Sequence, residues 1–513
     1  METGVASIYR FKALLNLYIM KRRQKMRISC SGCGKKAKKI DQLGLCSECG
    51  GMITVHYDLE RMRNKPKESF FHGTGVWRYC SLLPLSSTDS PVSLGEGGTS
   101  LLRSQRLGEI LGMSKLHLKN ETTNPTGSFV DRGTTIEMTH ARDLGYRSIA
   151  CALSGNLSAS VAAYAARAGM SSEALLLPSI DLAKLYQIVA YGAKISQVKN
   201  QTEAERKLIA MGEEVHCITS QSPFFLEGIK TTGIEMLEQM NWHPPDRIIV
   251  SIGSGAHLMM IWKAMKELEE IGLINASRVK MTGVQMTGCA PIVEALGKKK
   301  QASRDENSVQ LAREIAIHHP HMTEWVIEAI KDSGGTAIAV EEREIIDAVQ
   351  LLARAEGIFA EPAAAATIAG LKNLLEERTV ERNERVICVI TGTGLKEPVT
   401  SARALRRFAG SRKTAIKMEK RIEMLDLGET KESILHLLKA KDDYGYGIWK
   451  GLKQEENIQI SVVSVYQHIS ELEAADLVRK DRIESSPKRR NRVLYSLTPR
   501  GKRYLASRTD IEK

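Results

Sequence analysis

Short apolar runs alternate with longer amphipathic stretches through the middle of the chain. The runs at 148–153 and 247–252 are rich in branched apolar residues, and each precedes a stretch with helical spacing, at 158–168 and 258–271. Strands that alternate with helices in this way predict a parallel sheet with helices on both faces. We therefore predict an α/β fold between residues 77 and 398.

The pattern changes after residue 402. Residues 403–429 are rich in lysine and arginine and predict a connecting helix. Three helical segments follow, at 434–438, after a turn at 443–448, and at 461–473. Two short apolar segments, 477–478 and 493–497, then flank a charged tip. Three helices followed by a two-stranded wing are typical of a winged helix-turn-helix domain, which we predict over residues 430–508.

Two pairs of cysteines lie near the amino terminus. Each pair has the spacing Cys-x-x-Cys, twelve residues separate the pairs, and the four residues are Cys30, Cys33, Cys46 and Cys49. This spacing predicts a closed tetrahedral thiolate site for a structural Zn²⁺ ion, and nearby glycines supply the tight turns that it needs. We predict a zinc ribbon over residues 27–62. The alternative is a set of surface thiols left by a decayed metal site.

Composition is typical of a soluble globular protein. Hydrophobic residues make up 42% and charged residues 26% of the 513 residues, a length typical of roughly two to four domains. No apolar run approaches the ~20 residues that span a bilayer. The other five cysteines are scattered, which favours a reducing compartment, so we expect a cytoplasmic protein without membrane contact. Residues 1–26 lack the features of a signal peptide, and we expect a disordered leader or a mis-called start with Met26 as the initiator.

The most informative single position lies in the segment 124–133. It reads Asn-Pro-Thr-Gly-Ser-Phe-Val-Asp-Arg-Gly and resembles the active-site signature of threonine synthase, a pyridoxal phosphate (PLP) enzyme. In that family, a lysine between the Phe and the Asp-Arg-Gly holds PLP as a Schiff base and carries protons during catalysis. The position is Val130 in this chain, and a valine can do neither. The resemblance therefore implies an enzyme fold that has lost its central catalytic group.

The resemblance to threonine synthase covers residues 63–402. It rests on ordered segments at 75–79, 94–99, 124–133, 226–231, 356–362 and 391–396. It implies a fold-type II PLP-dependent enzyme architecture, in which two α/β subdomains enclose the cofactor between them.

The resemblance also implies which residues hold PLP. A glycine-rich turn between a strand and a helix binds phosphate through backbone N–H groups, and the turn here consists of Gly253, Ser254, Gly255, Ala256 and His257. Asn156 matches the residue that hydrogen-bonds the ring hydroxyl, and Thr391 matches the partner of the ring nitrogen. The family usually has glycine at position 256, so Ala256 would be strained if its φ were positive. Without the resemblance, the turn would be a plain connection.

Several other pocket positions are less polar than in the family. Leu153 stands where threonine synthases have serine or threonine, Ala364 replaces a serine, and Phe225 occupies what resembles the arginine position that grips the substrate phosphate. Lys184, at another substrate-phosphate position, is retained. We interpret these changes as a pocket that no longer turns over phosphohomoserine but still holds non-covalent PLP, an amino-acid-like small molecule, or both. The alternative is random decay of an unused site.

Three sequence motifs near the carboxyl end are similar to motifs of a family of regulators. They are Tyr-Gly-Tyr at 444–446, Tyr-x-x-Ile-x-x-Leu-Glu at 466–473 and Tyr-x-Leu-Thr-x-x-Gly at 495–501, and together they resemble PadR-type transcription regulators. The third helix of such a domain meets base edges and its wing contacts phosphates. The predicted DNA contacts are Ser461, Ser464, Gln467, Lys488, Arg489, Arg490 and Arg492. The net charge of +13 fits an acidic partner such as DNA.

Three functions remain open from the sequence. The leading one is a homodimeric DNA-binding transcription regulator whose PLP fold senses a ligand. Regulators of the PadR type dimerise through helices after the wing, and little of the chain follows Leu505, so we expect the dimer contact in the threonine synthase-like domain. The second is an active PLP enzyme in which another lysine, such as Lys119 or Lys230, takes over. The third is a structural pseudoenzyme that acts as a scaffold.

Overall fold

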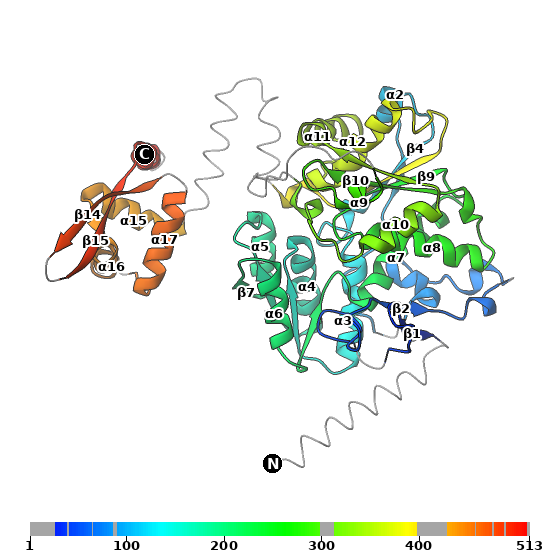
Figure 1. The fold of residues 1–513 in the computed structure, drawn as a ribbon, viewed down its shortest axis with the longest axis horizontal. Coiled ribbons are helices and arrows are strands. Elements are labelled where there is room, and N and C mark those ends of the chain that lie inside the picture. Colours follow the sequence, from blue (N-terminus) through cyan, green and yellow to red (C-terminus); the bar gives the residue numbers. More distant parts are fainter. Residues whose placement is uncertain are drawn as a thin grey trace, which may run out of the picture. The chain divides into compact units, whose positions relative to one another are not determined.

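The structure is a computed structural model that forms two compact units, Met1–Leu405 and Arg406–Lys513 (Figure 1). The described residues are 26–37, 40–63, 65–85, 90–297, 312–397, 428–456, 458–474, 477–486 and 489–509. Of the leader expected at 1–26 and the connecting helix expected at 403–429, residues 1–25 and 403–427 lie outside the described residues. Among the residues that are described, no helix has the length and apolar character needed to cross a membrane. The predicted domain boundaries stay predictions.

A small hairpin opens the first unit. Strand β1 (Arg27–Cys30) pairs antiparallel with β2 (Ile53–His56), and both cysteine-bearing turns lie in the segment that connects the two strands. Ile28 and Val55 belong to a buried cluster that also includes Phe224 of helix α7. The hairpin is thus joined to the rest of the unit by a shared apolar core.

The larger sheet of this unit has the strand order β11-β10-β9-β12-β4-β3 and is parallel except that β3 runs antiparallel to β4. Its strands are β3 (Leu101–Arg103), β4 (Leu116–Asn120), β9 (Arg247–Ser251), β10 (Lys280–Met286), β11 (Thr336–Val340) and β12 (Val386–Ile390). The helices of this part are α2 (Arg106–Leu111), α7 (Pro223–Gln239), α8 (Ala256–Glu270), α9 (Pro291–Ala295), α10 (Thr323–Asp332), α11 (Glu342–Glu356) and α12 (Pro362–Glu376).

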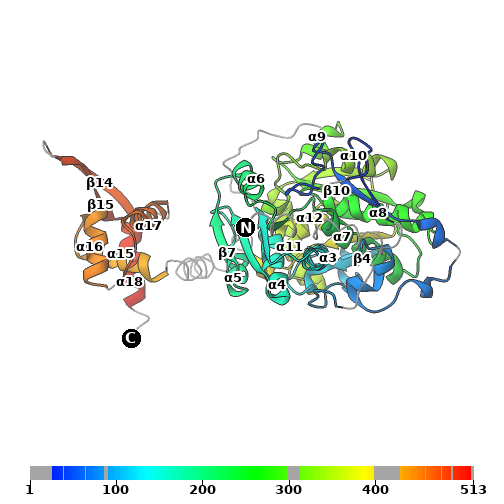
Figure 2. The same cartoon turned by 90° about the horizontal axis from the view of Figure 1, so that it is seen from below.

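A smaller parallel sheet with the order β7-β6-β5-β8 forms the second half of the unit. Its strands are β5 (Ser148–Ala152), β6 (Ser171–Leu176), β7 (Lys194–Gln197) and β8 (Val215–Ile218). Its helices are α3 (Asp131–Asp143), α4 (Gly155–Ala168), α5 (Leu182–Ala190) and α6 (Gln201–Ala210), and Figure 2 shows α4, α5 and α6 near β7. Short 3-10 turns join these elements: η1 (Leu59–Arg61), η2 (Lys67–Ser69), η3 (Gly75–Leu82), η4 (Glu121–Thr123), η5 (Ala276–Arg278), η6 (Arg313–Ile315) and η7 (Gly394–Lys396).

The central strand β12 shows why the sheet is buried on both faces. Successive side chains of a strand point to opposite faces. Ile387 and Val389 belong to the apolar cluster that contains residues of α7 and α8. Cys388 and Ile390 belong to the cluster that contains residues of α11 and α12. Each face is therefore covered by helices, which confirms the predicted α/β fold with two subdomains.

The second unit consists of α15 (Gly428–Ala440), β13 (Asp443–Tyr444), α16 (Gly445–Gln454), α17 (Val462–Ala474), β14 (Val478–Ser486), β15 (Arg489–Leu497) and α18 (Pro499–Thr509). Strands β14 and β15 form an antiparallel hairpin, and β13 pairs with β15. Three helices followed by a hairpin confirm the predicted winged-helix order. The pattern did not predict α18, whose Leu505 is buried in the core of its own unit.

Candidate functional site

The valine-bearing signature lies beside the segment that follows β12. Backbone N–H of Phe129 donates to the carbonyl oxygen of Thr391 at 3.0 Å, and N–H of Thr393 donates to the carbonyl oxygen of Gly127 at 2.9 Å. Gly127 has φ +81°, and a Cβ there would lie 2.6 Å from Cγ2 of Thr393. Only glycine accommodates both this backbone conformation and this close approach. Two motifs from distant parts of the sequence thus form one wall of the candidate site.

Further contacts connect this wall to the predicted cofactor residues. The ring of Phe129 stacks on His257 of the glycine-rich turn, with centroids 3.9 Å apart. Glu361 accepts hydrogen bonds from Asn156 Nδ2 at 3.1 and 3.0 Å, and its own backbone N–H donates to the carbonyl oxygen of Gly392 at 2.9 Å. We call Asn156, residues 253–257 and Thr391 the cofactor site, because these contacts bring all of them together.

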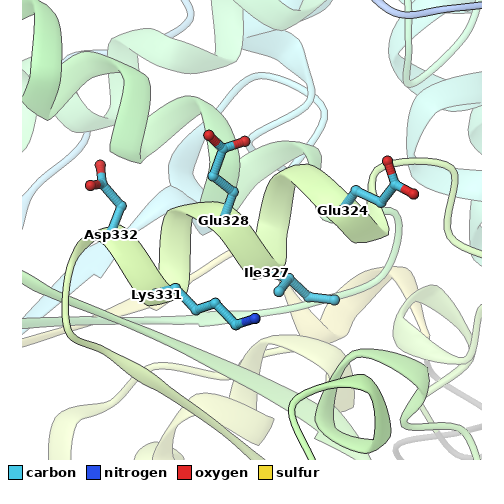
Figure 3. A pocket seen from close by; sticks show the side chains of 5 residues that line it. All are labelled: Glu324, Ile327, Glu328, Lys331 and Asp332. Atoms are coloured by element: carbon cyan, nitrogen blue, oxygen red, sulfur yellow. The ribbon is translucent and has the colours of Figure 1, made fainter. Parts of the chain in front are cut away.

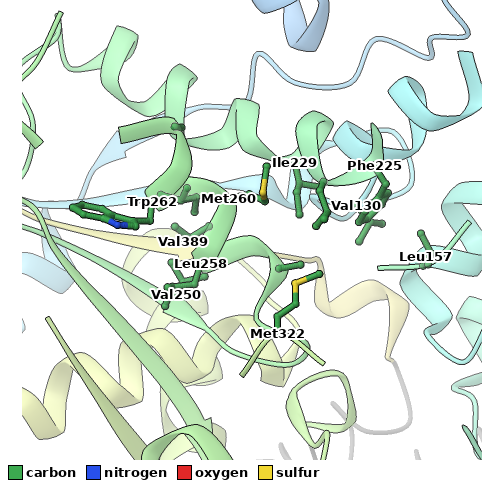
Figure 4. Packing of buried hydrophobic residues seen from close by; sticks show 14 of the residues in the cluster. Val130, Leu157, Phe225, Ile229, Val250, Leu258, Met260, Trp262, Met322 and Val389 are labelled. Carbon is green, nitrogen blue, oxygen red and sulfur yellow. The ribbon is translucent and has the colours of Figure 1, made fainter. Parts of the chain in front are cut away.

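Val130 lies in an apolar environment. Its side chain is 6% exposed and belongs to the large core cluster, together with Leu157 and Phe225 (Figure 4). The ring of Phe225 lies directly against Gly133, where an added Cβ would be 2.4 Å from Cδ2 of Phe225. Apolar packing thus occupies both positions at which the resemblance implies a basic side chain.

The arginine of the Asp-Arg-Gly part of the signature stabilises the fold through a buried ion-pair network. Arg132 is fully buried and its guanidinium bonds the carboxylates of Glu121 and Glu235, each at 2.7 Å. Lys119 lies in the same network, with its Nζ atom 2.6 Å from Glu235. Burial alone would raise the pKa of Glu235, but the attraction of Arg132 and Lys119 outweighs it and holds that pKa well below its usual range.

The two lysines considered as replacements for the missing one, Lys119 and Lys230, form ion pairs with buried glutamates. Lys119 donates to Glu235 in the network of Arg132. Lys230 forms ion pairs with Glu227 and, at 2.8 Å, with Glu267. Both amines are thus held in buried ion pairs with glutamates, so neither is left unpaired to replace the missing lysine.

The glycine-rich turn has the geometry of an anion-binding helix start. It connects β9 to α8, and Gly255, with φ +92°, is the residue that caps the helix. A Cβ on Gly253 would lie 2.3 Å from the carbonyl oxygen of Glu314, so this position also requires glycine. Ala256 is the first residue of α8 and has no positive φ, so the strain considered for it does not arise. The first N–H groups of α8 point out of the helix start, as phosphate binding requires.

Side chains of the turn add no positive charge to it. His257 Nε2 lies 3.1 Å from Oγ1 of Thr232, and burial lowers the pKa of His257 to about 3. Ser254 accepts a hydrogen bond from the N–H of Ala256 at 3.4 Å. Backbone dipoles and the helix start would therefore carry the recognition of a phosphate here.

Lys184 meets three carboxylates. Its Nζ atom lies 2.6 Å from Glu397, 2.8 Å from Glu314 and 3.4 Å from Glu361. Burial disfavours the ammonium form, but the attraction of these carboxylates outweighs burial and raises the pKa of Lys184. The lysine that the resemblance assigns to a substrate phosphate is thus neutralised by the protein itself.

The polar atoms left without partners show that the residues fit a polar ligand. Among the residues that the structure describes, four buried atoms around the cofactor site lack a hydrogen bond: Ser128 Oγ, Asn156 Oδ1, His257 Nδ1 and Lys396 Nζ. Buried polar groups are nearly always paired, and each unpaired one costs about 1–3 kcal/mol. The donors and acceptors at this site, with the helix start for a phosphate, are the groups that PLP needs.

Leu153 carries backbone strain at the turn that leads to Asn156. Its φ is +70°, a left-handed conformation that a branched side chain rarely adopts. Such a residue costs about 1–2 kcal/mol. Strained residues persist where the surrounding structure holds them and often lie at functional sites.

Two hollows of the first unit lie elsewhere. One, of about 660 Å³, follows helix α10 alone and is lined by Glu324, Ile327, Glu328, Lys331 and Asp332 (Figure 3). The other, of about 420 Å³, lies between β2 and helices α7, α8 and α10, and Lys263 and Glu267 line it. Neither hollow includes a residue of the cofactor site.

The four predicted metal ligands come together in the ribbon. The Sγ atoms of Cys30, Cys33, Cys46 and Cys49 all lie within 4.8 Å of one another. A Cβ on Gly51 would lie 2.8 Å from Sγ of Cys30, so the turn requires glycine beside the sulfurs. Four thiolates at this separation fit a tetrahedral Zn²⁺ ion.

The predicted DNA contacts fall on α17 and the wing. Ser461 and Gln467 are exposed and Ser464 is half-buried, and Ser461 Oγ accepts a hydrogen bond from the N–H of Ser464 at 3.1 Å. The predicted wing residues Arg489, Arg490 and Arg492 lie on β15, where the register pairs Arg492 with Glu484 of β14. Lys488 lies outside the described residues.

Comparison with protein families assigns both units. The model described as "Pyridoxal-phosphate dependent enzyme" matches residues 92–392. The chain belongs to the family of pyridoxal-phosphate-dependent enzymes. The model described as "Transcriptional regulator PadR-like family" matches residues 434–507. A threonine synthase-like domain and a PadR-like domain are therefore joined in one chain.

Threonine synthases are among its relatives. The enzyme of Methanocaldococcus jannaschii is 44% identical over 383 residues, which cover 73% of this chain and 94% of that protein. The enzyme of Methanosarcina acetivorans is 37% identical over 379 residues, covering 73% of this chain and 93% of the relative. The enzyme of Mycobacterium leprae is 40% identical over 329 residues, 63% of this chain and 88% of the other.

Solved structures support the fold of the PLP-dependent family. An O-ureido-L-serine-bound mutant of O-ureido-L-serine synthase matches with a TM-score of 0.51 at 19% identity, over 65% of this chain and 98% of that one. The L-serine ammonia-lyase of the fungus Rhizomucor miehei matches with a TM-score of 0.50 at 18% identity, over 60% of this chain and 98% of the other. At these identities the likeness shows the fold alone.

Sequence reasoning missed two residues of the site. Glu361 and Lys396 lie in two of the segments that resemble threonine synthase, 356–362 and 391–396, but neither was predicted to be a site residue. The signal for Lys396 was a lysine two residues beyond the last glycine of a turn at the end of a buried strand. The signal for Glu361 was a carboxylate directly before a proline that begins a helix.

Proposed function

We propose that the protein is a DNA-binding transcription regulator whose threonine synthase-like domain senses a small molecule instead of making threonine. The observation that carries this proposal is Val130, which lies in apolar packing beside Phe225 in a chain that also has a PadR-like domain. An enzyme of this family needs an amine where Val130 stands, whereas a ligand sensor does not.

The ligand of the cofactor site is PLP, an amino-acid-like molecule, or both. PLP supplies an aldehyde that condenses with amines and a ring that accepts electrons. The start of α8 would hold the phosphate, and Asn156 and Thr391 would orient the ring. Asn156 Oδ1 and Ser128 Oγ have no hydrogen-bond partner among the described residues, which supports a polar occupant.

Loss of threonine synthase activity follows from two side chains. Val130 has no amine, and Phe225 cannot form the charge-assisted hydrogen bonds that an arginine makes to a phosphate. We infer that phosphohomoserine is not converted to threonine. An assay for threonine formation by the full chain tests this point, and turnover at ordinary enzymatic rates would overturn it.

The PadR-like domain would read DNA with Ser461, which directly precedes α17, and with the exposed Gln467 of α17, and would contact phosphates with the wing. We propose that the protein acts as a homodimer in the cytoplasm, because regulators of this type read paired half-sites. The Zn²⁺ ion that we assign to the four cysteines would be structural, since four thiolates leave no open coordination position.

A gel-shift titration tests the regulatory function. The full chain should bind DNA from upstream of its own gene at least 10³-fold more tightly than random DNA of equal length, the lower end of the usual ratio. A control protein carries Lys488→Ala, Arg489→Ala and Arg490→Ala together. Equal affinity of the full chain for upstream and random DNA at every salt concentration would refute sequence-specific regulation.

A further inference from the structure

Four lysine side chains are buried among the described residues: Lys119, Lys184, Lys230 and Lys396. The first three each have a carboxylate oxygen within 2.8 Å of the Nζ atom. Lys396 Nζ differs, because it has no hydrogen-bond partner in the described part of the chain although the residue is only 2% exposed. An unpaired amine in such a place is costly, so it calls for a chemical explanation.

Lys396 lies at the turn that leads to Val130. A Cβ on Gly127 would lie 3.4 Å from Cδ of Lys396, so the lysine stem runs along Gly127. The segment around Gly127 is hydrogen-bonded to the segment that carries Thr391 and Lys396. The charges of Asp131 and Glu361 both act on the amine. The amine is thus placed among the residues of the cofactor site, close to the start of α3.

The surrounding charges explain why this amine is free. The carboxylates that act on this amine are Glu361, Asp131 and Glu314. Glu361 and Glu314 are held by Lys184, and Asp131 accepts hydrogen bonds from Thr126 and Ser160. Burial lowers the pKa of Lys396, the attraction of Glu361 offsets this in part, the positive charge of Lys184 also lowers it, and the resulting pKa is about 8. A lysine with such a pKa has a sizeable neutral fraction near neutral pH, and the neutral amine is the nucleophile.

We propose that Lys396 is the amine that binds an aldehyde ligand of the PLP class covalently, in place of the lysine that is missing at position 130. The inference rests on the proposed function, since it requires that the cofactor site holds such a ligand. Lys396 Nζ adds to the aldehyde carbon, a carbon–nitrogen double bond forms and the carbon–oxygen bond breaks. The oxygen leaves as water with the two hydrogens of the amine, so the step needs no oxidant or reductant.

Reductive trapping on the full chain tests the proposal. The protein is incubated with pyridoxal phosphate, reduced with borohydride, digested, and mapped by mass spectrometry. We expect the reduced adduct on the peptide that contains Lys396, together with an imine absorbance whose amplitude rises with pH around 8, since the pKa of Lys396 is about 8.

Two variants sharpen the test. Lys396→Met keeps the length of the side chain and removes an unpaired buried amine, so it should fold and lose the adduct. The double variant Lys396→Met with Val130→Lys should move the adduct to the peptide that contains position 130. An adduct in Lys396→Met equal to wild type, an adduct confined to other lysines of the wild type, or no adduct at all would overturn the proposal.

The same samples distinguish a failure of this proposal from a failure of the proposed regulatory function. If equilibrium dialysis shows PLP bound without a trapped adduct, and PLP still changes DNA affinity, Lys396 is not the anchoring amine but the regulator remains. If the adduct forms on Lys396 and the chain does not bind DNA specifically, the covalent site stands and the regulatory function fails.

Discussion

Replacing Arg132 by methionine should destabilise the first unit strongly. The guanidinium of Arg132 is fully buried and bonds both Glu121 and Glu235. Its removal leaves Lys119 as the remaining ion-pair partner of Glu235. Glu121 loses its ion pair and keeps the hydrogen bonds from Thr99 and Asn124. Breaking a buried ion pair by removing one partner costs about 3–5 kcal/mol. With a central value of ~4 kcal/mol, the unfolding temperature should fall by roughly 8 °C, at about 2 °C per kcal/mol for a large domain.

Scanning calorimetry of the full chain measures this effect. The two compact units provide an internal reference, because the transition of the PadR-like unit should not move when Arg132 changes. The matched control is Arg142→Met on the same helix, since Arg142 is half-exposed and pairs with its neighbour Asp143. Exposed pairs contribute about 0–1 kcal/mol, so the control should shift the transition by less than about 2 °C.

The pH dependence of the Arg132→Met effect has a defined sign. In the wild type the pKa of Glu121 and of Glu235 is lowered by Arg132 against the opposing effect of burial. Such carboxylates stabilise the fold above their unfolded pKa of about 4.3, and this stabilisation is lost as pH falls below it. In the variant, Lys119 is the remaining cation that opposes burial, so both pKa values rise relative to the wild type and the destabilisation becomes smaller as pH falls. A destabilisation of less than about 1 kcal/mol, or one that grows toward acid pH, would refute the role assigned to Arg132.

Three further predictions concern the metal, the wing and the missing lysine. Changing Cys46 to serine should lower bound Zn²⁺ from one ion per chain, measured by elemental analysis, and unchanged metal content would exclude the thiolate site. Changing Lys488, Arg489 and Arg490 together to alanine should lower the slope of log affinity against log salt by up to about 3, close to one per phosphate contact, and an unchanged slope would exclude wing contacts. Val130→Lys alone should add an imine absorbance with PLP and give no threonine, because Phe225 cannot bind the substrate phosphate as an arginine does. Full turnover by this variant would contradict the prediction.

The fold was predictable because its signals are local. The alternation of apolar runs and amphipathic stretches identified the parallel sheets, and β12 shows the reason, since its side chains are buried on both faces. The order of three helices and a charged hairpin identified the winged helix, because each of these elements also has a local sequence pattern. The antiparallel edge strand β3 was not predicted, because its three residues are too few for a period to show. Helix α18 was not predicted, because few of its eleven residues are apolar.

The candidate site was predictable only in part. Motifs placed Val130, Asn156 and Thr391, but no local pattern shows that Lys396 runs along Gly127 or that three carboxylates surround Lys184. These contacts join segments that are far apart in the sequence. They depend on which side chains are buried together and on how their charges balance in the folded protein. The positive φ of Leu153 is likewise a property of the folded turn, since leucine alone does not favour it.

We propose that a ligand in the cofactor site changes how the PadR-like unit binds DNA. The measurement that tests this most directly is the Kd of the full chain for its upstream DNA, by fluorescence anisotropy, with and without saturating PLP. We expect a change of about 5–150-fold, the usual range of coupling between sites, and an equal change in PLP affinity when DNA is added. The control Asn156→Ala should reduce the response. An identical Kd with and without PLP, under conditions where dialysis shows PLP bound, would contradict the proposed coupling between the cofactor site and DNA binding.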